Sequence, residues 1–407
     1  MAREEPGVSP MTSPGGALPA DPASIVDALI LHAVQERATD IHLAPAPAGG
    51  SVRMRVDGLL RDVHELDGSV YPKVVSRIKV LGEMDIAERR KPQDGRFSHP
   101  VEDRAVDLRV SSIPALHGES IVLRLLDRAS GLRDITQIGM PSREAQLFSS
   151  FLAEPSGLII VTGPTGAGKS TTLYAALQRL AVPERNVLSI EDPVEYEVPR
   201  VLQTALQTKI GVGFAGLLRS ILRHDPDVIM VGEVRDAETA EVCVRASLTG
   251  HLVLTSLHTH RAADAVTALL NFGVKSYALA PALRGVVAQQ LLREICPECK
   301  TSFEYGEAAL ADPDFESLLP PGRQPSFSIG LGCQRCFGSG YRGRRAVFEV
   351  LDVSGPVQEA VLRGAHADEV EKVAVGEGMS MLRRNGFRAV LEGWTTVEEV
   401  VRAVHLA

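Results

Sequence analysis

The sequence of 407 residues predicts an α/β protein in which a smaller α+β domain precedes a mostly parallel sheet covered by helices. Three observations favour this class. Short apolar runs alternate with segments of helical periodicity, polar or glycine-rich residues follow these runs, and an earlier part of the chain alternates apolar with polar residues. The apolar runs cover residues 158–161, 187–190, 228–231 and 252–255. The helical segments cover residues 171–181, 213–223 and 237–247.

Composition restricts the kinds of function that the chain can have. The formal net charge of -8 gives no long-range attraction to nucleic acid or anionic lipid, which argues against a nucleic-acid motor. Residues 1–22 are rich in Pro, Gly and Ser, lack the apolar core of a secretory signal, and are expected to form a flexible tail. The longest apolar region, residues 277–292, contains Pro281 and Arg284 and is shorter than the ~20 residues of a membrane helix. Any membrane association is therefore expected to be indirect.

The smaller domain is expected at residues 23–130. It begins with an amphipathic helix at residues 23–34. Strands with a period of two follow, and Asp57-Gly58 is a strong hairpin-turn signal. The strands are expected at residues 52–56, 106–110 and 121–125.

A charged segment at residues 88–96 interrupts these strands, and Asp94-Gly95 within it has the composition of a turn. Its arginines have two interpretations. They are either part of a solvated loop or arginine fingers that close on a γ-phosphate. Residues 131–150 show little periodicity and are expected to link this domain to the next.

A complete P-loop lies between the first apolar run of the sheet and a helical segment. Its residues are Gly163, Pro164, Thr165, Gly166, Ala167, Gly168, Lys169 and Ser170, followed by Thr171. Glycines let backbone N–H groups surround phosphate oxygens, and the helix N-terminus adds further donors. Lys169 is expected to reach the β- and γ-phosphates and Ser170 to hold Mg²⁺. A chance glycine-rich turn is the alternative, but the strand and helix on either side favour a nucleotide site for ATP with Mg²⁺.

Carboxylates follow two of the neighbouring strands. Glu191, Asp192 and Glu195 cluster where residues 187–190 end, and they are placed either to order water or Mg²⁺ or to form a surface acidic turn. Glu233 follows residues 228–231, and Gly232 stands where many P-loop enzymes have the Mg²⁺-binding Asp. Glu233 is therefore the candidate to polarise the attacking water.

His258 follows the fourth apolar run of the sheet. An isolated histidine is commonly a satisfied core residue. At the end of a strand beside a nucleotide, however, His258 could instead sense the γ-phosphate. Both interpretations remain open from the residues alone.

Two C-x-x-C pairs suggest a metal site. Cys296, Cys299, Cys333 and Cys336 supply the four thiolates that one tetrahedral Zn²⁺ needs, which leaves no position for water and predicts a structural site. The gap between the pairs is wide for a zinc ribbon, so unpaired structural cysteines or a redox role are the alternatives. Cys243 is most simply a buried small apolar residue.

The chain resembles the secretion ATPases of type II secretion and type IV pilus assembly from residue 25 to the C-terminus. The first group of matching motifs is R-A-T-D-I-H-L (37–43), V-R-M-R-V-D-G-L-L (52–60), K-P-Q-D-G-R-F (91–97), V-D-L-R-V-S (106–111) and H-G-E-S-I-V-L-R-L-L (117–126). The second is G-P-T-G-A-G-K-S-T-T (163–172), E-D-P-V-E (191–195), L-R-H-D-P-D-V-I-M-V-G-E-V-R-D (222–236) and T-G-H-L-V-L-T-S-L-H-T (249–259).

This resemblance implies a PAS-like N-terminal domain, a RecA-like P-loop ATPase domain and assembly as a homo-hexamer. The implied order is a tail (1–22), the PAS-like domain (23–130), a linker (131–150), the RecA-like core (151–295), a zinc element (296–345) and a helical C-terminal region (346–407). Glycines 376, 378, 386 and 393 are expected to separate the helices of that last region.

The resemblance also implies roles for individual residues. Glu191 and Glu195 match an Asp box that positions Mg²⁺ and water, and Glu233 matches the Walker B glutamate. Arg96 and Arg109 match arginines of the N-terminal domain that approach the γ-phosphate. His258, in turn, matches the histidine-box residue.

The cysteines resemble the zinc-bearing element of the assembly branch. Together these features imply a cytoplasmic ATPase, peripheral at the inner membrane, that assembles a type IV pilus or a type II secretion pseudopilus with a membrane platform protein. No nucleic acid is expected as a partner. Two departures stand out: the usual extra N-terminal docking domain is not apparent, and Gln290 replaces a common arginine. A DNA-translocating ring ATPase and a low-turnover regulatory protein are the alternative functions.

Overall fold

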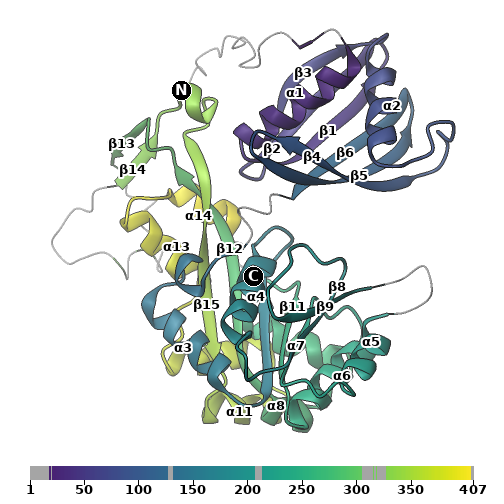
Figure 1. The fold of residues 1–407 in the computed structure, drawn as a ribbon. Coiled ribbons are helices and arrows are strands. Elements are labelled where there is room, and N and C mark those ends of the chain that lie inside the picture. The colour runs from purple at the N-terminus through teal and green to yellow at the C-terminus, as the bar shows by residue number, and fades with distance from the viewer. Residues whose placement is uncertain are drawn as a thin grey trace. The chain divides into compact units, whose positions relative to one another are not determined.

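The computed structural model describes residues 18–19, 21–126, 132–206, 213–304, 315, 318 and 327–404. The chain divides into two compact units, Met1–Ser130 and Gly131–Ala407, whose elements are labelled in Figure 1. Most of the predicted tail at residues 1–22 lies outside the described residues, but Pro22 already begins helix α1.

The first unit is an antiparallel sheet with its apolar face covered by helices. The described strands have the order β3-β2-β1-β6-β5-β4. Helices α1 and α2 pack on the same apolar face, where alternate strand residues form one buried core. The elements are α1 (Pro22–Gln35), β1 (Ala38–Ala46), β2 (Gly49–Val56), β3 (Leu59–Asp67), α2 (Tyr71–Leu81), β4 (Gln93–Val101), β5 (Arg104–Ala115) and β6 (Gly118–Leu126).

The two turn signals of this unit have different outcomes. Asp57 and Gly58 join β2 to β3 with φ angles of 48° and 87°, as the predicted tight hairpin requires. Asp94 and Gly95 lie inside β4 and pair with β5, so the prediction of a turn there is wrong. Cross-strand hydrogen bonding to β5 outweighs the local turn preference.

The second unit contains the predicted, mostly parallel sheet. Its described strands have the order β15-β12-β7-β11-β10-β8-β9, and only β15 runs antiparallel to its neighbour. The four predicted apolar runs are β7, β11, β10 and β8. The strands are β7 (Gly157–Thr162), β8 (Val187–Glu191), β9 (Val201–Ala205), β10 (Val228–Val231), β11 (Leu252–Leu257), β12 (Leu283–Ile295) and β15 (Tyr341–Asp352).

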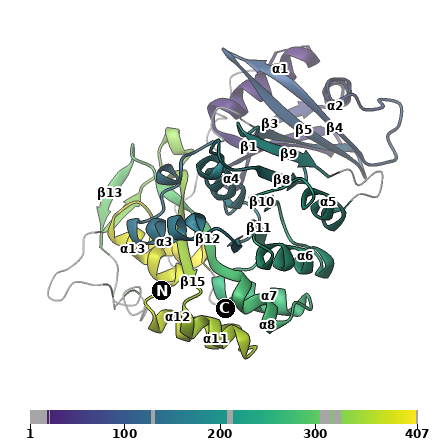
Figure 2. The same ribbon diagram turned by 60° about the horizontal axis from the view of Figure 1, so that its bottom comes forward.

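Helices cover both faces of this sheet. Leu158 and Ile160 of β7 belong to one buried core, and Ile159 and Val161 belong to another, as expected for a strand buried on both faces. Figure 2 shows α6 and α7 on one side and α3 and α4 on the other. The helical elements are η2 (Ile135–Gln137), α3 (Ser142–Ala153), α4 (Lys169–Leu180), α5 (Phe214–Ile221), α6 (Ala237–Leu248), α7 (Ala262–Asn271) and α8 (Ser276–Ala282).

The stretch assigned to a linker, residues 131–150, contains structured elements. Elements η2 and α3 lie there, and Phe148 and Phe151 of α3 are buried in the core beneath β7 and β12. The buried apolar side chains of α3 are Phe148, Phe151 and Leu152, and most of its other residues are polar or small, so its apolar face is short.

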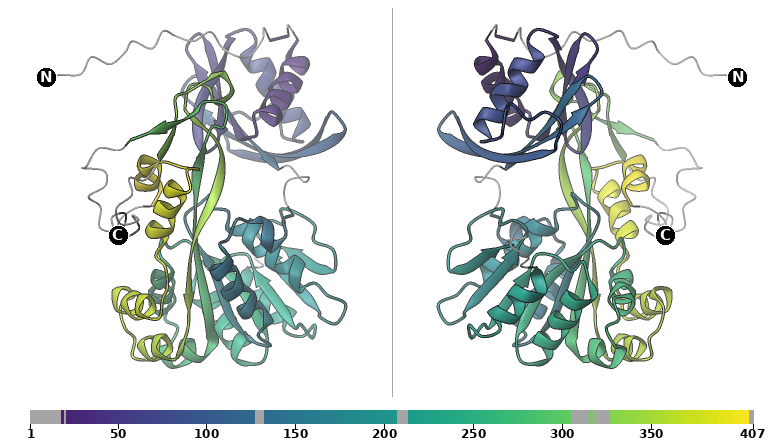
Figure 3. Two further views of the ribbon diagram at one scale, coloured as in Figure 1. Left: turned by 90° about the vertical axis from the view of Figure 1, so that its left-hand side faces the viewer. Right: turned by 90° about the vertical axis from the view of Figure 1, so that its right-hand side faces the viewer.

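The last part of the chain begins with a long pair of strands. Strand β12 pairs with β7 only from Leu283 to Ala288 but continues beside β15 as far as Ile295, and Figure 3 shows the two strands running on together. Residues 346–352, expected to be helical, belong to β15. The remaining elements are β13 (Lys300–Phe303), β14 (Phe327–Gly330), η4 (Gln334–Cys336), α11 (Gly355–Leu362), α12 (Ala367–Gly376), α13 (Leu382–Leu391) and α14 (Val397–Ala403).

The C-terminal region is helical, as predicted, from α11 to α14. Gly378 and Gly393 lie between its helices, whereas Gly386 lies within α13 and does not end a helix. Among the described residues, no helix combines the length and the apolar character that crossing a membrane requires.

Candidate functional site

The P-loop connects β7 to α4 through a backbone that only glycine tolerates well. Gly163 has a φ of 150°, and a Cβ there would lie 2.4 Å from the carbonyl oxygen of Gln289. Gly168 is the N-cap of α4 in the left-handed conformation, with φ of 89°. The loop therefore curls at the N-terminus of a helix, where unpaired N–H groups can bind phosphate oxygens.

Lys169 lies at this loop. Its Nζ donates to the carbonyl oxygens of Gly163 and Pro164 at 2.7 and 3.1 Å, and it lies 3.4 Å from Nδ1 of His258. Burial lowers the pKa of Lys169, while the negative charge of Glu233 acts in the opposite direction. The ammonium group is thus held among acceptors that a phosphate could replace.

Glu233 and His258 meet beside this lysine, although 25 residues separate them in the sequence. Nε2 of His258 lies 2.8 Å from Oε2 of Glu233. Because Nε2 faces a carboxylate and Nδ1 faces an ammonium group, the contacts fit an imidazole that is protonated at Nε2. The structure therefore brings together three residues that the sequence placed at the ends of different strands.

Arg235 completes this cluster and was missed by the sequence analysis. It forms an ion pair with Glu233, and its Nη1 lies 3.5 Å from Asp192. Burial raises the pKa of Glu233, but hydrogen bonds from Arg235 and His258 outweigh it and lower the pKa overall. Glu233 is therefore ionised. The one signal in the sequence for Arg235 was its position two residues after Glu233.

Glu191 has a different environment from Glu233. It is buried and accepts hydrogen bonds from the Tyr174 hydroxyl, from Ser189 Oγ at 2.6 Å and from Gln203 Nε2 at 3.0 Å. Burial and the Glu191 carboxylate raise the pKa of Tyr174, so the hydroxyl keeps its proton and donates it. Nothing in the sequence signals Tyr174, which also accepts from the backbone N–H of Glu195 at 3.1 Å.

Gln289 ties the P-loop to the next strand of the sheet. Its side chain is buried, its Oε1 accepts from Thr172 Oγ1, and its Nε2 donates to the carbonyl of Ala167, each at 2.7 Å. Gln290, whose role was left open, is half-buried and pairs with Val347 of β15. The glutamine that supports the P-loop is thus Gln289, and not Gln290, which stands where relatives commonly have an arginine.

Arg96 and Arg109 lie in the first unit, directly opposite each other on β4 and β5. They belong to a row of residues paired from strand to strand across the sheet. The row is Arg55, Asp40, Arg124, Arg109 and Arg96. Asp40 is buried and accepts from Nε of Arg124 at 3.0 Å. With four arginines and one carboxylate, the row is strongly basic.

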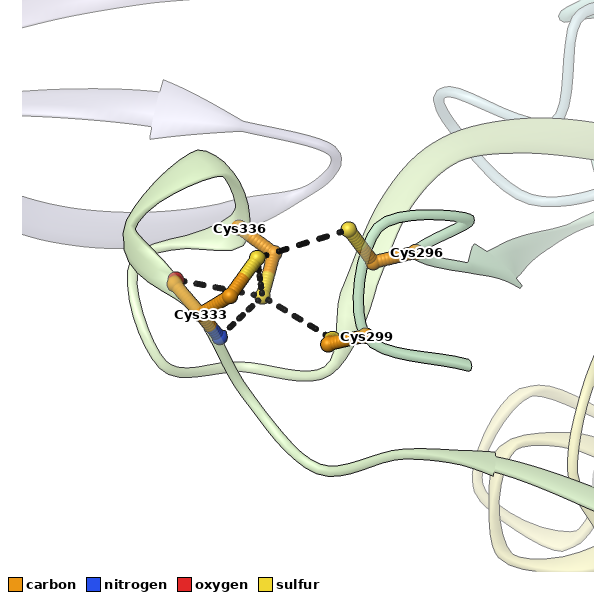
Figure 4. A group of neighbouring side chains, drawn as sticks. All are labelled: Cys296, Cys299, Cys333 and Cys336. Carbon is orange, nitrogen blue, oxygen red and sulfur yellow. Dashed lines mark hydrogen bonds between the residues drawn. The ribbon is translucent and has the colours of Figure 1, made fainter. Parts of the chain in front are cut away.

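The four cysteines of the predicted zinc site come together at the far end of β12 and at η4, as Figure 4 shows. All four Sγ atoms lie within 4.8 Å of one another, and three of the separations are 3.9, 3.8 and 3.7 Å. Tetrahedral zinc with Zn–S bonds of ~2.3 Å requires sulfur atoms ~3.8 Å apart. The residues therefore fit one Zn²⁺ with four thiolate ligands.

The backbone around Cys336 favours the thiolate form of this residue, whereas burial raises the pKa of Cys296 and of Cys299. N–H groups of Cys333 and Gly340 lie 3.1 and 3.3 Å from Sγ of Cys336. Burial raises the pKa of Cys336, but these donors outweigh it and lower the pKa to about 7. Cys243 is buried within α6, away from this group, as predicted for an apolar residue.

Comparison with known proteins supports the same fold. The pattern of the family described as Type II/IV secretion system protein matches residues 20–402. The chain is 44% identical over 378 residues to the Type II secretion system protein E of Pseudomonas aeruginosa, covering 93% of this chain and 74% of that protein. It is 41% identical over 382 residues to the Type IV pilus assembly ATPase PilB of Thermus thermophilus, covering 92% of this chain and 42% of that protein.

A solved structure confirms the predicted fold class. The ATPase DotB of Legionella pneumophila superposes with a TM-score of 0.70 and 20% sequence identity, covering 95% of this chain and 96% of that one. At this level of identity the likeness establishes the fold alone.

Proposed function

Because the chain belongs to the type II/IV secretion system protein family, which includes secretion and pilus-assembly ATPases, we propose that it is a hexameric, Mg²⁺-dependent ATPase. Its hydrolysis of ATP to ADP and phosphate drives assembly of a type IV pilus or a type II secretion pseudopilus. The observation that carries this proposal is the cluster of Lys169, His258 and Glu233 beside the P-loop.

Residues of the P-loop bind the triphosphate. Main-chain N–H groups from Gly163 to Thr171 surround the phosphates, and Lys169 exchanges its loop carbonyls for the β- and γ-phosphate oxygens. Ser170 is the residue that holds Mg²⁺, with Glu191 and Glu195 acting through water. Bound Mg²⁺ neutralises the charge that develops on the phosphate oxygens.

Glu233 orients the attacking water. Its ionised carboxylate can accept a hydrogen bond from that water, because Arg235 and His258 keep its pKa low. The imidazole of His258 lies between Glu233 and Lys169. When the γ-phosphate binds Lys169, the imidazole can shift and so change the position of the Glu233 carboxylate. Positioning of this kind supplies most of the catalysis of phosphoryl transfer.

Arg96 and Arg109 approach the γ-phosphate from the N-terminal domain. The pairing of Arg96 with Arg109 across β4 and β5 supports this role, because two neighbouring guanidinium groups suit a phosphate anion. Binding of triphosphate draws this domain in and hydrolysis releases it, so that phosphate charge is converted into domain rotation. Rotation within a ring then moves a partner at its centre.

The remaining parts of the proposal concern structure and location. The zinc element stabilises the end of the β12–β15 pair, and one Zn²⁺ per chain is held by Cys296, Cys299, Cys333 and Cys336. The N-terminal domain ends at residue 130, the ATPase unit begins at residue 131 and so includes α3, and the C-terminal helices begin with α11 at Gly355. The protein acts in the cytoplasm and reaches the inner membrane through a platform protein.

One set of measurements on the purified chain tests this function. Phosphate release from ATP should require added Mg²⁺ and stop with EDTA, and light scattering should show a mass of six chains with nucleotide. DNA should leave the rate unchanged. Absence of turnover would favour a regulatory protein, and salt-sensitive stimulation by DNA would favour a translocating motor.

A further inference from the structure

Glu349 joins the beginnings of two helices that are distant in the sequence. It lies in β15 opposite Ala288, and only 1% of its surface is exposed. Its Oε1 accepts from the N–H of Ala262, the first residue of α7, and its Oε2 accepts from the N–H of Leu382, the first residue of α13; both distances are 2.8 Å. A single buried carboxylate therefore holds α7, β15 and α13 together.

The segment that leads into α7 starts at the catalytic cluster. After β11 come His258 and Thr259, and α7 begins at Ala262. The N–H of Thr259 donates to Oγ1 of Thr162 at 2.9 Å, and Thr162 is the last residue of β7 before the P-loop. Residues 258–262 are thus fixed at one end to the P-loop strand and at the other to Glu349.

A second contact links the same segment to the C-terminal helices. Arg261 forms ion pairs with Asp264 of α7 at 2.8 Å and with Asp368 and Glu371 of α12 at 3.0 and 3.5 Å. The C-terminal helices therefore hold the His258 segment through two contacts. Helix α12 forms ion pairs with Arg261, and α13 donates a hydrogen bond to Glu349, which also accepts one from the start of α7.

The start of α13 is also fixed to β15 beside Glu349. Nδ2 of Asn385 donates to the carbonyl oxygen of Phe348 at 2.7 Å. Consecutive residues of β15 thus bind α13, so a displacement of this helix acts directly on Glu349.

A carboxylate is the side chain that suits this position. Two N–H donors require two acceptor oxygens, and a glutamine would present an NH₂ group to one of them. Burial of an ionisable group costs stability, and an apolar side chain would avoid that cost. We therefore attribute the presence of Glu349 to the position in which it holds α7 and α13, and not to stability.

We propose that Glu349 is a positioning residue for ATP hydrolysis: by holding α7 to α13 it sets His258 against Glu233 and couples the C-terminal helices to the nucleotide site. This rests on the proposed ATPase function and on the role given there to His258. Movement of α12 and α13, by a partner or a neighbouring chain, then changes the contact between His258 and Glu233.

A double-mutant cycle on the full chain tests the coupling. At pH 8, where Glu349 is mostly ionised, Glu349→Gln should lower kcat about tenfold and change KM for ATP less than about twofold, because the P-loop itself is untouched. In a His258→Ala background, the same change should lower kcat by no more than about twofold, since its effect passes through His258. The control Glu359→Gln, at an exposed carboxylate of α11, should leave kcat unchanged.

Other outcomes separate this inference from the proposed function. Unchanged kcat in Glu349→Gln, or an equal loss in both backgrounds, would overturn the role of Glu349 while leaving the ATPase intact. Absence of turnover in the wild-type chain would instead contradict the proposed function. A His258→Ala variant with full kcat would leave the ATPase function intact but overturn both the role of His258 and the coupling through it. If Glu349→Gln shows no cooperative transition in thermal unfolding, it does not fold. Glu349→Asp, which keeps the charge on a shorter side chain, then replaces it in the same cycle.

Discussion

His258 donates from Nε2 to Oε2 of Glu233 across 2.8 Å, and this contact joins the ends of two adjacent strands of the sheet. Because the partners come from β10 and β11, any shift between these strands changes the position of the carboxylate that we assign to the attacking water. The contact thus places the proposed chemistry at the carboxyl ends of parallel strands, as is general for such sheets.

Replacement of Glu233 should remove turnover and keep nucleotide binding. Glu233→Ala is expected to lower kcat by about 10²- to 10⁴-fold, because the water loses the group that orients it. Phosphate release and binding of a fluorescent ATP analogue measure the two effects separately. Glu238→Gln is the matched control, since this carboxylate is exposed and pairs with Arg219. Unchanged steady-state hydrolysis by Glu233→Ala would remove Glu233 from the mechanism.

Replacement of Lys169 should act on binding itself. Lys169→Ala loses a charge-assisted contact with the phosphates, so the affinity for ATP should fall by about 10- to 100-fold. Equilibrium binding of the fluorescent analogue measures the loss, and Lys275→Ala, at an exposed lysine before α8, provides the control. Wild-type affinity in the Lys169 variant would contradict the assignment of the phosphate site.

The arginines of the first unit should affect hydrolysis more than binding. Arg96→Ala and Arg109→Ala are each expected to lower kcat by about 10³-fold, as for arginine fingers elsewhere, with ATP affinity nearly unchanged. Arg89→Ala, at an exposed arginine before β4, should behave as the wild type. Equal rates in all three variants would show that the row does not reach the nucleotide.

The zinc site predicts both a metal content and a stability change. The wild-type protein should contain one zinc per chain by elemental analysis, and Cys296→Ser should lose it. A loss of about 2 kcal/mol would lower Tm by about 5 °C. Cys243→Ala removes the cysteine outside the cluster and should retain the metal. A wild-type chain without bound metal would argue against the site.

Glu349 should make stability depend on pH. Burial raises its pKa to about 7 from an ordinary value of 4.5, with N–H donors from Ala262 and Leu382 opposing this, Glu371 adding to it and Arg261 reducing it. The folded chain therefore binds the proton more tightly than the unfolded chain. The resulting stability is present in full below about pH 4.5 and is lost as the pH rises through about 7.

Urea denaturation of the wild type and Glu349→Gln checks this sign. The amide has no proton to release, so from pH 5 to pH 8 the variant should gain up to about 3 kcal/mol in unfolding free energy relative to the wild type. A difference between the two proteins that does not change with pH would show that Glu349 titrates normally in the fold.

The sequence contained the features that depend on neighbouring residues. The apolar runs identified β7, β8, β10 and β11, Asp57-Gly58 identified a hairpin, and Gly163 to Ser170 identified the turn between β7 and α4, because each pattern is a local constraint on the backbone. The spacing of the cysteines was sufficient to predict a metal cluster, since the chemistry of four thiolates is specific.

Predictions became unreliable where local preference and tertiary contact disagree. Asp94-Gly95 has the composition of a turn but pairs within a sheet, and α3 has weak periodicity but buries Phe148. Residues 346–352 belong to a strand only because β12 lies beside them. In each case the partner is distant in the sequence and supplies the deciding hydrogen bonds or apolar contacts.

Local sequence therefore determined the glycine-rich turn that we assign to phosphate and the four thiols that fit a metal ion. Only the folded chain decided which side chains contact and position these groups. Arg235 pairs with Glu233, Tyr174 donates to Glu191, Gln289 holds the P-loop, and Glu349 joins α7 to α13. The physical reason is that a carboxylate's pKa and position depend on donors within a few ångströms in space. Those donors come from strands and helices whose order in the sheet does not follow their order in the sequence.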